Sequence, residues 1–390
     1  MNVKTHASPL DSAARLRHFD SSRDRIAETI RQLVEFESPS DHKPSADRLA
    51  EMLAGRFESI GGHAKLHKVP NVGNHLQVDF EGRKSAKPIL LLGHYDTVYP
   101  VGTLKAMPCR LDDGHLYGPG ALDMKSGIAF MLHVVAALRQ WYEDNLPRPI
   151  SVLLVSDEEI GSDSSRPITE SLARRSGAVL VLEPSLGPKG ALKTARKGVG
   201  EYVLKVTGKS AHSGLDFEKG QSAILELARQ IVAIQKLIDL TRGLTLNVGL
   251  VQGGTRVNVV PGEASASLDV RIASMKEAAA IERKLRALKP VNRHCKLEIK
   301  GGINRPPMER TPGVAALYKK AADIAKQLRW KLEEASVGGG SDGNFTAGLG
   351  IPTLDGLGGV GEGAHASHES IVISELPRRC VLLSELIEQA

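Results

Sequence analysis

Three short apolar runs alternate with helical patterns in the first half of this 390-residue chain. The runs are PILLLG at 88–93, ISVLLVS at 150–156 and AVLVLE at 178–183. Because buried parallel strands are apolar on both faces, this alternation predicts a mainly parallel sheet sandwiched by helices. Ligands of such sheets gather beyond the carboxyl ends of the strands, so we expect the chemistry at the residues that follow these runs.

Near residue 198 the pattern changes to segments in which apolar and polar residues alternate. Four such segments and two helical segments follow in the order β-α-β-β-α-β, which is typical of a ferredoxin-like α+β sandwich with one solvated sheet face. After residue 306 the α/β pattern resumes. We therefore predict an α/β domain formed by residues 1–197 and 307–390, interrupted by an inserted domain over 198–306.

The composition, with 41% apolar and 25% charged residues, is that of a soluble globular protein. The net charge is +6, but the basic residues are spread along the chain without forming a run. Aromatic residues, on which bases could stack, make up only 4%, so we expect no nucleic-acid partner. No segment approaches the roughly 18 apolar residues of a membrane span, so we expect no membrane partner either. Cys109, Cys295 and Cys380 lie far apart, and the N-terminus lacks an apolar stretch of signal-peptide length. These features predict a cytoplasmic protein, although a leader removed earlier would leave no trace.

A histidine or a carboxylate residue follows each predicted strand. His94 and Asp96 follow the first, Glu158 and Glu159 the second, and Glu183 the third. Each has an ordinary alternative, because a single HxD after a strand is often a turn and an acidic pair is often a solvated helix cap. Two further segments complete the set, with Asp123 after YGPGA and His365 and His368 in GAHASHES.

Nitrogen and oxygen ligands without thiolate suit zinc, cobalt or manganese. Two histidines with three carboxylates match the ligand count of two zinc ions that share one bridging carboxylate. Asp96, two residues after His94, can accept the imidazole N–H and fix the tautomer of the ring. Because neighbouring side chains point in different directions, one of Glu158 and Glu159 can hold metal while the other accepts a proton from water.

These motifs together are similar to those of the co-catalytic di-zinc exopeptidases and deacylases, a family that includes glutamate carboxypeptidase, acetylornithine deacetylase and succinyl-diaminopimelate desuccinylase. The resemblance runs from about residue 89 to residue 380. It implies that the α/β domain is catalytic and binds two zinc ions, and that the inserted domain serves as a lid and as a homodimer contact. The matching stretches are LLGHYDTV, YGPGALDMKSG, VSDEEIGS, LEP, GKSAHSG, RVNVVPGEASASLDVR, GGGSDGN and GAHASHESI.

The resemblance implies a role for each residue of the predicted centre. Glu158 is the implied general base, Asp96 orients His94, and a cis peptide is implied after Asp123. His365 rather than His368 matches the family histidine, because Glu369 follows it at the usual spacing. The implied ligands are His94, Asp123 and Glu183 for one ion, and Asp123, Glu159 and His365 for the other.

The inserted domain carries three further matches. His212 resembles a histidine that, in dimeric members, reaches the partner's active site and polarises the scissile carbonyl. Asn258 and Arg271 resemble lid residues that bind the substrate or its carboxylate. As alternatives, Arg271 can pair with a nearby acid on its strand, and His212 can be an exposed loop residue.

The substrate is predicted from two short stretches. Arg305 precedes proline in GGINRPP, and a similar Arg-Pro in glutamate carboxypeptidase binds the substrate's glutamate; alternatively, Arg305 fixes a hinge. Gly340 and Ser341 in GGGSDGN offer an N–H and a hydroxyl to the substrate. We therefore predict release of a C-terminal glutamate-like residue from a small N-acyl or peptidyl substrate with a free carboxylate. Deacylation of an N-acyl amino acid is the alternative, and a non-catalytic relative is disfavoured because all six matching positions are intact.

Overall fold

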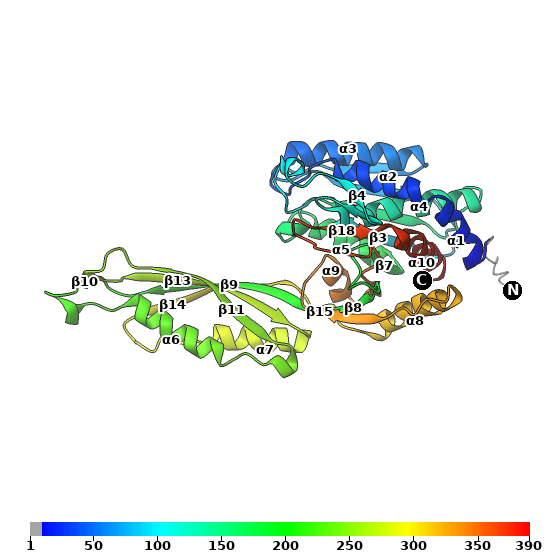
Figure 1. Cartoon of the computed structure of the whole chain (residues 1–390). Helices are drawn as coiled ribbons and strands as arrows, with labels where there is room; N and C mark the ends of the chain where they lie inside the picture. Colours follow the sequence, from blue (N-terminus) through cyan, green and yellow to red (C-terminus); the bar gives the residue numbers. More distant parts are fainter. Residues whose placement is uncertain (1–9) are drawn as a thin grey trace. The chain divides into compact units, whose positions relative to one another are not determined.

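The computed structural model describes residues 10–390, which divide into two compact units (Figure 1). Unit 1 contains the chain up to Thr194 together with Arg310–Ser336 and Ser341–Ala390, and unit 2 contains Ala195–Glu309 and Val337–Gly340.

The short segment Val337–Gly340 belongs to unit 2 and not, as predicted, to the second part of the α/β domain. Hydrogen bonds to the first residues of unit 2 explain this placement. The Lys197 N–H donates to the Val337 carbonyl at 2.9 Å, and the Arg196 guanidinium donates to the carbonyls of Gly339 and Gly340. The sequence pattern gave no sign of this pairing, because the segment is too short and too rich in glycine to show a period.

Unit 1 is built around a six-stranded sheet with the order β1-β2-β6-β3-β7-β16. The strands β6, β3, β7 and β16 are parallel, whereas β1 and β2 form an antiparallel edge. The predicted sandwich with a mainly parallel sheet is therefore confirmed. The strands are β1 (His63–His67), β2 (His75–Phe80), β3 (Ile89–His94), β6 (Ile150–Val155), β7 (Ala178–Val181) and β16 (Thr353–Leu354).

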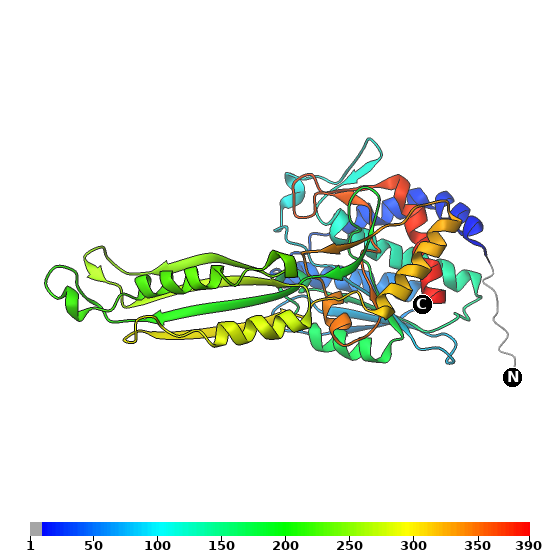
Figure 2. The same ribbon diagram turned by 90° about the horizontal axis from the view of Figure 1, so that it is seen from below.

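Helices cover both faces of this sheet (Figures 1 and 2). Successive side chains of a strand point to opposite faces, and β3 shows this directly. Ile89 and Leu91 join the core formed with α2, α3, α4, α8 and α10, whereas Leu90 and Leu92 join the core under α5. The helices are α1 (Ser12–Ser21), α2 (Arg23–Val34), α3 (Lys43–Ser59), α4 (Ser126–Trp141), α5 (Arg166–Arg175), α8 (Pro312–Gln327), α9 (Gly343–Gly348) and α10 (Leu376–Gln389).

One helical stretch, Ala121–Trp141, is long and apolar enough to cross a membrane by length and composition, contrary to our expectation. Its most apolar 18-residue window has a mean hydropathy of 1.5. Of that window, 83% is buried inside the structure. Most of this stretch is α4, the central helix of the unit 1 core, and a helix that is apolar on nearly all sides is expected in such a buried position.

A second, four-stranded sheet of unit 1 has the order β17-β18-β5-β4. It joins the segment that precedes Asp123 to the segment that follows His365, because β5 pairs with β18. These strands are β4 (Arg110–Asp112), β5 (His115–Tyr117), β17 (Gly361–Glu362) and β18 (Ser370–Val372); β8 (Leu192–Arg196) and β15 (Glu334–Val337) lie at the unit boundary.

Unit 2 contains an antiparallel sheet with the order β11-β13-β9-β14, and α6 and α7 pack on one of its faces (Figure 2). Along β9, buried residues alternate with exposed ones, so the other face is solvated. This is the order of a ferredoxin-like sandwich. Its elements are β9 (Gly198–Thr207), β10 (Ala211–His212), α6 (Ala223–Gln235), β11 (Thr245–Gly253), β12 (Val259–Val260), β13 (Glu263–Ile272), α7 (Met275–Arg286) and β14 (Lys296–Arg305).

His133 on α4 makes the stability of unit 1 sensitive to acid. Burial, reinforced by Arg25 and Arg56, lowers its pKa from 6.5 to about 4. Between these pH values His133 binds a proton in the unfolded chain but not in the folded chain. The free energy of unfolding therefore falls as the pH drops from about 6.5 to about 4. We expect His133 to account for a loss of about 2 to 3 kcal/mol.

Urea unfolding at pH 7 and pH 4.5 measures this loss. The His133→Gln variant should lose less stability between the two pH values than the wild type, whereas His63→Gln, at an exposed position of β1, should lose as much. An equal loss in His133→Gln and the wild type would contradict the assignment.

Candidate metal centre

The predicted site residues follow the carboxyl ends of three adjacent parallel strands. His94 is the last residue of β3, Glu158 and Glu159 open the 3₁₀ turn Glu158–Ile160 after β6, and Glu183 lies two residues beyond β7. The order β6-β3-β7 places His94 between the two acidic positions. The sheet therefore gathers the side chains that the apolar runs predicted to lie together.

Asp123 reaches the same place from the turn that precedes α4. The turn spans Ala121–Lys125, and its Asp123–Met124 peptide is cis, as the family resemblance implied. Gly120 enters the turn with a φ of 74°, a left-handed conformation that favours glycine. The Asp123 carboxylate consequently points at the histidine of the central strand.

The carboxylate of Asp123 lies between two histidines. Its Oδ1 is 3.2 Å from His94 Nε2, and its Oδ2 is 3.5 Å from His365 Nε2. His94 Nε2 is also 3.4 Å from Glu183 Oε1, and His365 Nε2 is 3.1 Å from Glu159 Oε1. Each histidine thus faces Asp123 and one further carboxylate, which divides the cluster into two halves that share Asp123.

The chemistry of this cluster fits divalent cations. Ligand atoms of His94, Glu158 and Glu183 lie within 4.8 Å of one another, and so do those of His94, Asp123 and Glu159. All of these atoms are imidazole nitrogens or carboxylate oxygens, the donors that zinc, cobalt and manganese accept. The residues present therefore fit divalent cations, but both groups contain His94, so they do not coincide with the two predicted ligand sets.

Asp96 holds two parts of the site in place. His94 Nδ1 lies 3.0 Å from the Asp96 carbonyl and 3.4 Å from its Oδ1, which directs Nε2 toward Asp123. The Asp96 carboxylate also accepts hydrogen bonds from Ser40 Oγ and from the backbone N–H groups of Glu158 and Glu159. The sequence predicted the contact to His94 but not the contacts that fix the acidic turn.

The protonation of the cluster follows from its crowding. Burial alone would lower the pKa of His94, but hydrogen bonds to Asp123, Asp96 and Glu183 raise it well above 6.5. Hydrogen bonds to Asp123 and Glu159 raise the pKa of His365 to about 10. Burial raises the pKa of Glu159. A cation that binds here must displace protons from the imidazoles, so its affinity falls as the pH drops.

A buried glutamate, Glu369, accepts hydrogen bonds from the backbone of Asp123 and its neighbours. Its carboxylate accepts hydrogen bonds from the backbone N–H groups of Gly120, Leu122 and Asp123 at 2.8 to 2.9 Å and from Tyr99 Oη at 2.7 Å. Burial raises the pKa of Glu369, and the donors of Asp123, Tyr99 and Gly120 offset part of that effect. In the sequence, Glu369 serves only to identify His365, four residues before it, and its hydrogen bonds to the Asp123 turn are not predicted.

Comparison with known proteins identifies the family. Residues 90–389 match the model of peptidase family M20/M25/M40. The chain belongs to this family. The resemblance inferred from the motifs is therefore confirmed.

Individual M20 relatives cover most of the chain. Carboxypeptidase G2 of Pseudomonas sp. strain RS-16 is 28% identical over 368 residues, which are 93% of this chain and 88% of that protein. Acetylornithine deacetylase of Salmonella arizonae is 31% identical over 263 residues, which are 63% of this chain and 67% of that protein. The crystal structure of aminopeptidase PepT from Bacillus cereus shares the fold, with a TM-score of 0.78, 22% identity and coverage of 94% and 98% of the two chains. The protein is thus an M20 metallohydrolase of peptides or N-acyl amino acids.

Three residues predicted to contact substrate, Ser341, Arg305 and Gly340, lie close to other protein groups. Ser341, fully buried, donates from Oγ to Asp355 Oδ2 at 2.7 Å and accepts the Gly343 N–H at 3.1 Å. Its hydroxyl therefore holds the start of α9, which makes it a poorer substrate donor than predicted. In unit 2, Arg305 is buried at the end of β14, and a Cβ on Gly340 would lie 3.0 Å from its Cδ. Gly340 thus leaves room for Arg305.

The three other predicted residues also lie in unit 2, so their relation to the metal centre stays a prediction. His212 and Asn258 are exposed, and Arg271 forms a two-pronged ion pair with Asp269 on the same strand. The pairing of Arg271 is the alternative that the sequence left open. Nδ1 of His212 accepts the N–H groups of Gly214 and Leu215, so the neutral ring carries its proton on Nε2.

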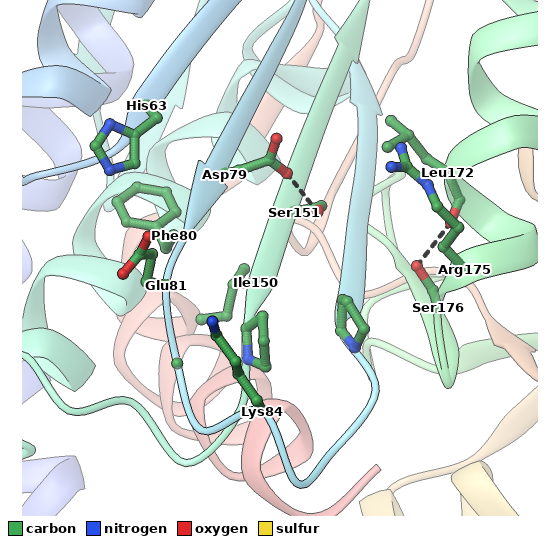
Figure 3. Close-up of a pocket in the computed structure, with 13 residues that line it drawn as sticks. His63, Asp79, Phe80, Glu81, Lys84, Ile150, Ser151, Leu172, Arg175 and Ser176 are labelled. Atoms are coloured by element: carbon green, nitrogen blue, oxygen red, sulfur yellow. Dashed lines mark hydrogen bonds between the residues drawn. The ribbon is translucent and has the colours of Figure 1, made fainter.

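Unit 1 also contains a cavity of about 340 Å³ at the opposite ends of the strands from the candidate metal centre (Figure 3). Its lining includes Pro88 and Pro149, which precede β3 and β6, and Ile150, the first residue of β6. Lys84 and Arg175 also line it (Figure 3). The metal centre lies at the carboxyl ends of the same strands, so this cavity is separate from it.

Metal content should separate ligands from orienting residues. His94→Ala should lose bound zinc, whereas Asp96→Ala should weaken zinc binding by roughly 10- to 100-fold, because the imidazole remains but is no longer held. Elemental analysis after dialysis against defined free zinc measures both variants.

The matched control is His368→Ala, an exposed histidine of the same loop as His365. It should retain the metal content of the wild type. Full zinc content in His94→Ala, or a greater loss in Asp96→Ala than in His94→Ala, would contradict the assigned roles.

Proposed function

We propose that this M20 enzyme hydrolyses the amide bond that joins a C-terminal glutamate-like residue to an N-acyl or peptidyl group. The similarity to a carboxypeptidase over 93% of the chain carries this choice. Arg305 before Pro306 adds to it, because the resemblance to glutamate carboxypeptidase implies that this arginine binds the substrate carboxylate. A guanidinium binds a carboxylate with two parallel hydrogen bonds, which suits an acidic leaving residue.

Two divalent cations complete the proposed centre. When bound, they lower the pKa of the attacking water and polarise the scissile carbonyl. Zinc is the proposed metal, with cobalt or manganese as alternatives. The ligands would be His94, Asp123 and Glu183 for one ion, and Asp123, Glu159 and His365 for the other.

Glu158 is the proposed general base. Its carboxylate lies in the same cluster as His94 and Glu183, and its backbone N–H is held by Asp96. Glu158 takes a proton from water as the oxygen attacks the carbonyl carbon, and it returns that proton to the amine nitrogen as the C–N bond breaks. His212, with its proton on Nε2, would donate a hydrogen bond to the oxygen of the tetrahedral intermediate.

Deacylation of an N-acyl amino acid is a second candidate. The 31% identity to acetylornithine deacetylase over 263 residues favours it. The same centre serves both reactions, because each breaks an amide beside a carboxylate. The two reactions differ in the part of the substrate that the pocket recognises: the released glutamate-like residue in the first, and the N-acyl amino acid in the second.

A homodimer through unit 2 is part of the proposal. β11 is an edge strand of its sheet, and the residues 249–253 are all exposed. Leu250 and Val251 on this strand are 64% and 57% exposed, and Val232 on α6 is 58% exposed. An edge strand with apolar side chains is a template for pairing with another chain, and a second copy would cover it.

The location of the enzyme is proposed to be cytoplasmic, with no nucleic-acid or membrane partner. Cys109, Cys295 and Cys380 are free thiols, as suits a reducing compartment.

A substrate panel tests the proposed reaction. On zinc-loaded enzyme, kcat/KM for an N-acyl-glutamate or a folate-like glutamate should exceed that for N-acetylornithine at least tenfold. Glu158→Gln should lower kcat by roughly 10²- to 10⁴-fold with unchanged metal content, because it removes only the proton acceptor. The control Glu51→Gln, at an exposed position of α3, should leave turnover unchanged. A preference for N-acetylornithine would overturn the substrate class, and near-normal turnover in Glu158→Gln would overturn the base.

The dimer is tested by light scattering. The wild type should show twice the chain mass of 41.9 kDa, and Leu250→Asp should shift it toward the monomer by placing a charge on the apolar edge. Leu111→Asp, at a similarly exposed position of unit 1, should not change the mass. A monomeric wild type, or a Leu250→Asp variant as dimeric as the wild type, would contradict the proposed contact.

A further inference from the structure

Glu369 joins the two chain segments that carry Asp123 and His365. Its Oε1 accepts the N–H groups of Leu122 and Asp123 at 2.8 and 2.9 Å. Its Oε2 accepts the Gly120 N–H at 2.9 Å and the Tyr99 hydroxyl at 2.7 Å. The residue is fully buried, so these donors replace the water that an exposed carboxylate would bind.

The backbone around Glu369 reinforces this connection. The Glu369 carbonyl accepts the Gly118 N–H at 3.1 Å, and Ser370 pairs with Tyr117 where β18 meets β5. Tyr99 Oη lies 3.1 Å from the carbonyl of Ala366, the neighbour of His365. The Glu369 carboxylate thus connects the turn before α4 with the loop that carries His365. Its backbone donors in that turn lie about 250 residues earlier in the sequence.

We propose that Glu369 is a positioning residue that fixes Asp123 relative to His365 and thereby sets the affinity of the second cation position, formed by Asp123, Glu159 and His365. The inference rests on the proposed di-metal function. Glu369 itself does not touch the donor atoms of that position; it holds the Asp123 backbone while the following β18 anchors the His365 loop.

The arrangement explains why a carboxylate is needed at this point. Both oxygens receive two donors each, and a glutamine side chain could supply only one acceptor oxygen. The amide nitrogen of a glutamine would face the Gly120 N–H or the Tyr99 hydroxyl, so at least one donor would meet another donor. The turn that aims Asp123 would then shift, although the volume of the side chain is conserved.

Glu226 in unit 2 provides a matched comparison. It is buried, and it accepts the N–H groups of Val291 and Asn292 at 2.8 Å and Gln230 Nε2 at 2.8 Å. Its replacement by glutamine removes a similar buried acceptor far from His365 in the sequence. A role limited to stability would therefore make Glu226→Gln and Glu369→Gln alike.

Titration with Co²⁺ tests the inference. Calorimetry gives the affinity of each ion, and the visible absorption of bound Co²⁺ reports the ligand geometry of each position. In Glu369→Gln we expect one ion to bind roughly 10- to 100-fold more weakly, with a changed absorption spectrum, and to match the ion weakened in His365→Ala. Glu226→Gln should lower the melting temperature but keep both affinities and the spectrum of the wild type.

Wild-type affinities and spectrum in Glu369→Gln would overturn the inference, whatever its melting temperature. Equal effects in Glu369→Gln and Glu226→Gln would overturn it as well, because they would reveal a structural role only. If Glu369→Gln does not fold, Tyr99→Phe takes its place: it removes one donor, and we expect a several-fold loss of affinity for the same ion. Unchanged affinity in Tyr99→Phe would then contradict the inference.

The test is independent of the substrate. An enzyme that prefers N-acetylornithine would refute the proposed substrate and leave the Co²⁺ result intact. Conversely, glutamate release by a wild type whose Co²⁺ affinity does not depend on Glu369 would refute the inference alone.

Discussion

The site depends on the position of the Asp123 carboxylate between His94 and His365. One of its oxygens faces His94 and the other faces His365, at 3.2 and 3.5 Å. A carboxylate can serve two cations at once only if its plane is fixed between them. The turn Ala121–Lys125, which follows the left-handed Gly120, carries this carboxylate, and the ends of the sheet strands carry His94, Glu159 and Glu183 around it.

Two further buried carboxylates hold the proposed ligands in place through hydrogen bonds. Asp96 fixes the ring of His94 and the backbone of Glu158 and Glu159, and Glu369 fixes the backbone of Asp123. Each is satisfied by several hydrogen bonds, which offsets the cost of burying a charge. A centre with this many negative groups gains from cations, because the cations neutralise the repulsion that the fold has imposed.

The sequence predicted the parts of the molecule that leave a periodic or chemical pattern. The apolar runs located β3, β6 and β7, and because parallel strands end at one edge, they also located His94, Glu158, Glu159 and Glu183. The alternating pattern after residue 198 located the ferredoxin-like unit. The role of Asp123 came from the family resemblance, since no local pattern reveals where a turn aims its side chain.

The remaining features depend on contacts that sequence spacing does not show. Val337–Gly340 belongs to unit 2 because of hydrogen bonds to Arg196 and Lys197, and Ser341 is engaged by Asp355. The role of Glu369 likewise lies in backbone groups about 250 residues earlier in the chain. Such side chain–backbone contacts leave no period and no motif, so only the folded structure reveals them.

The most direct test of the proposed di-metal centre is X-ray diffraction of the zinc-loaded protein at the zinc absorption edge. We expect two anomalous peaks on either side of the Asp123 carboxylate, one beside His94 and Glu183 and the other beside Glu159 and His365. A single peak, or peaks that do not contact Asp123, would contradict the assignment of Asp123 as the shared ligand.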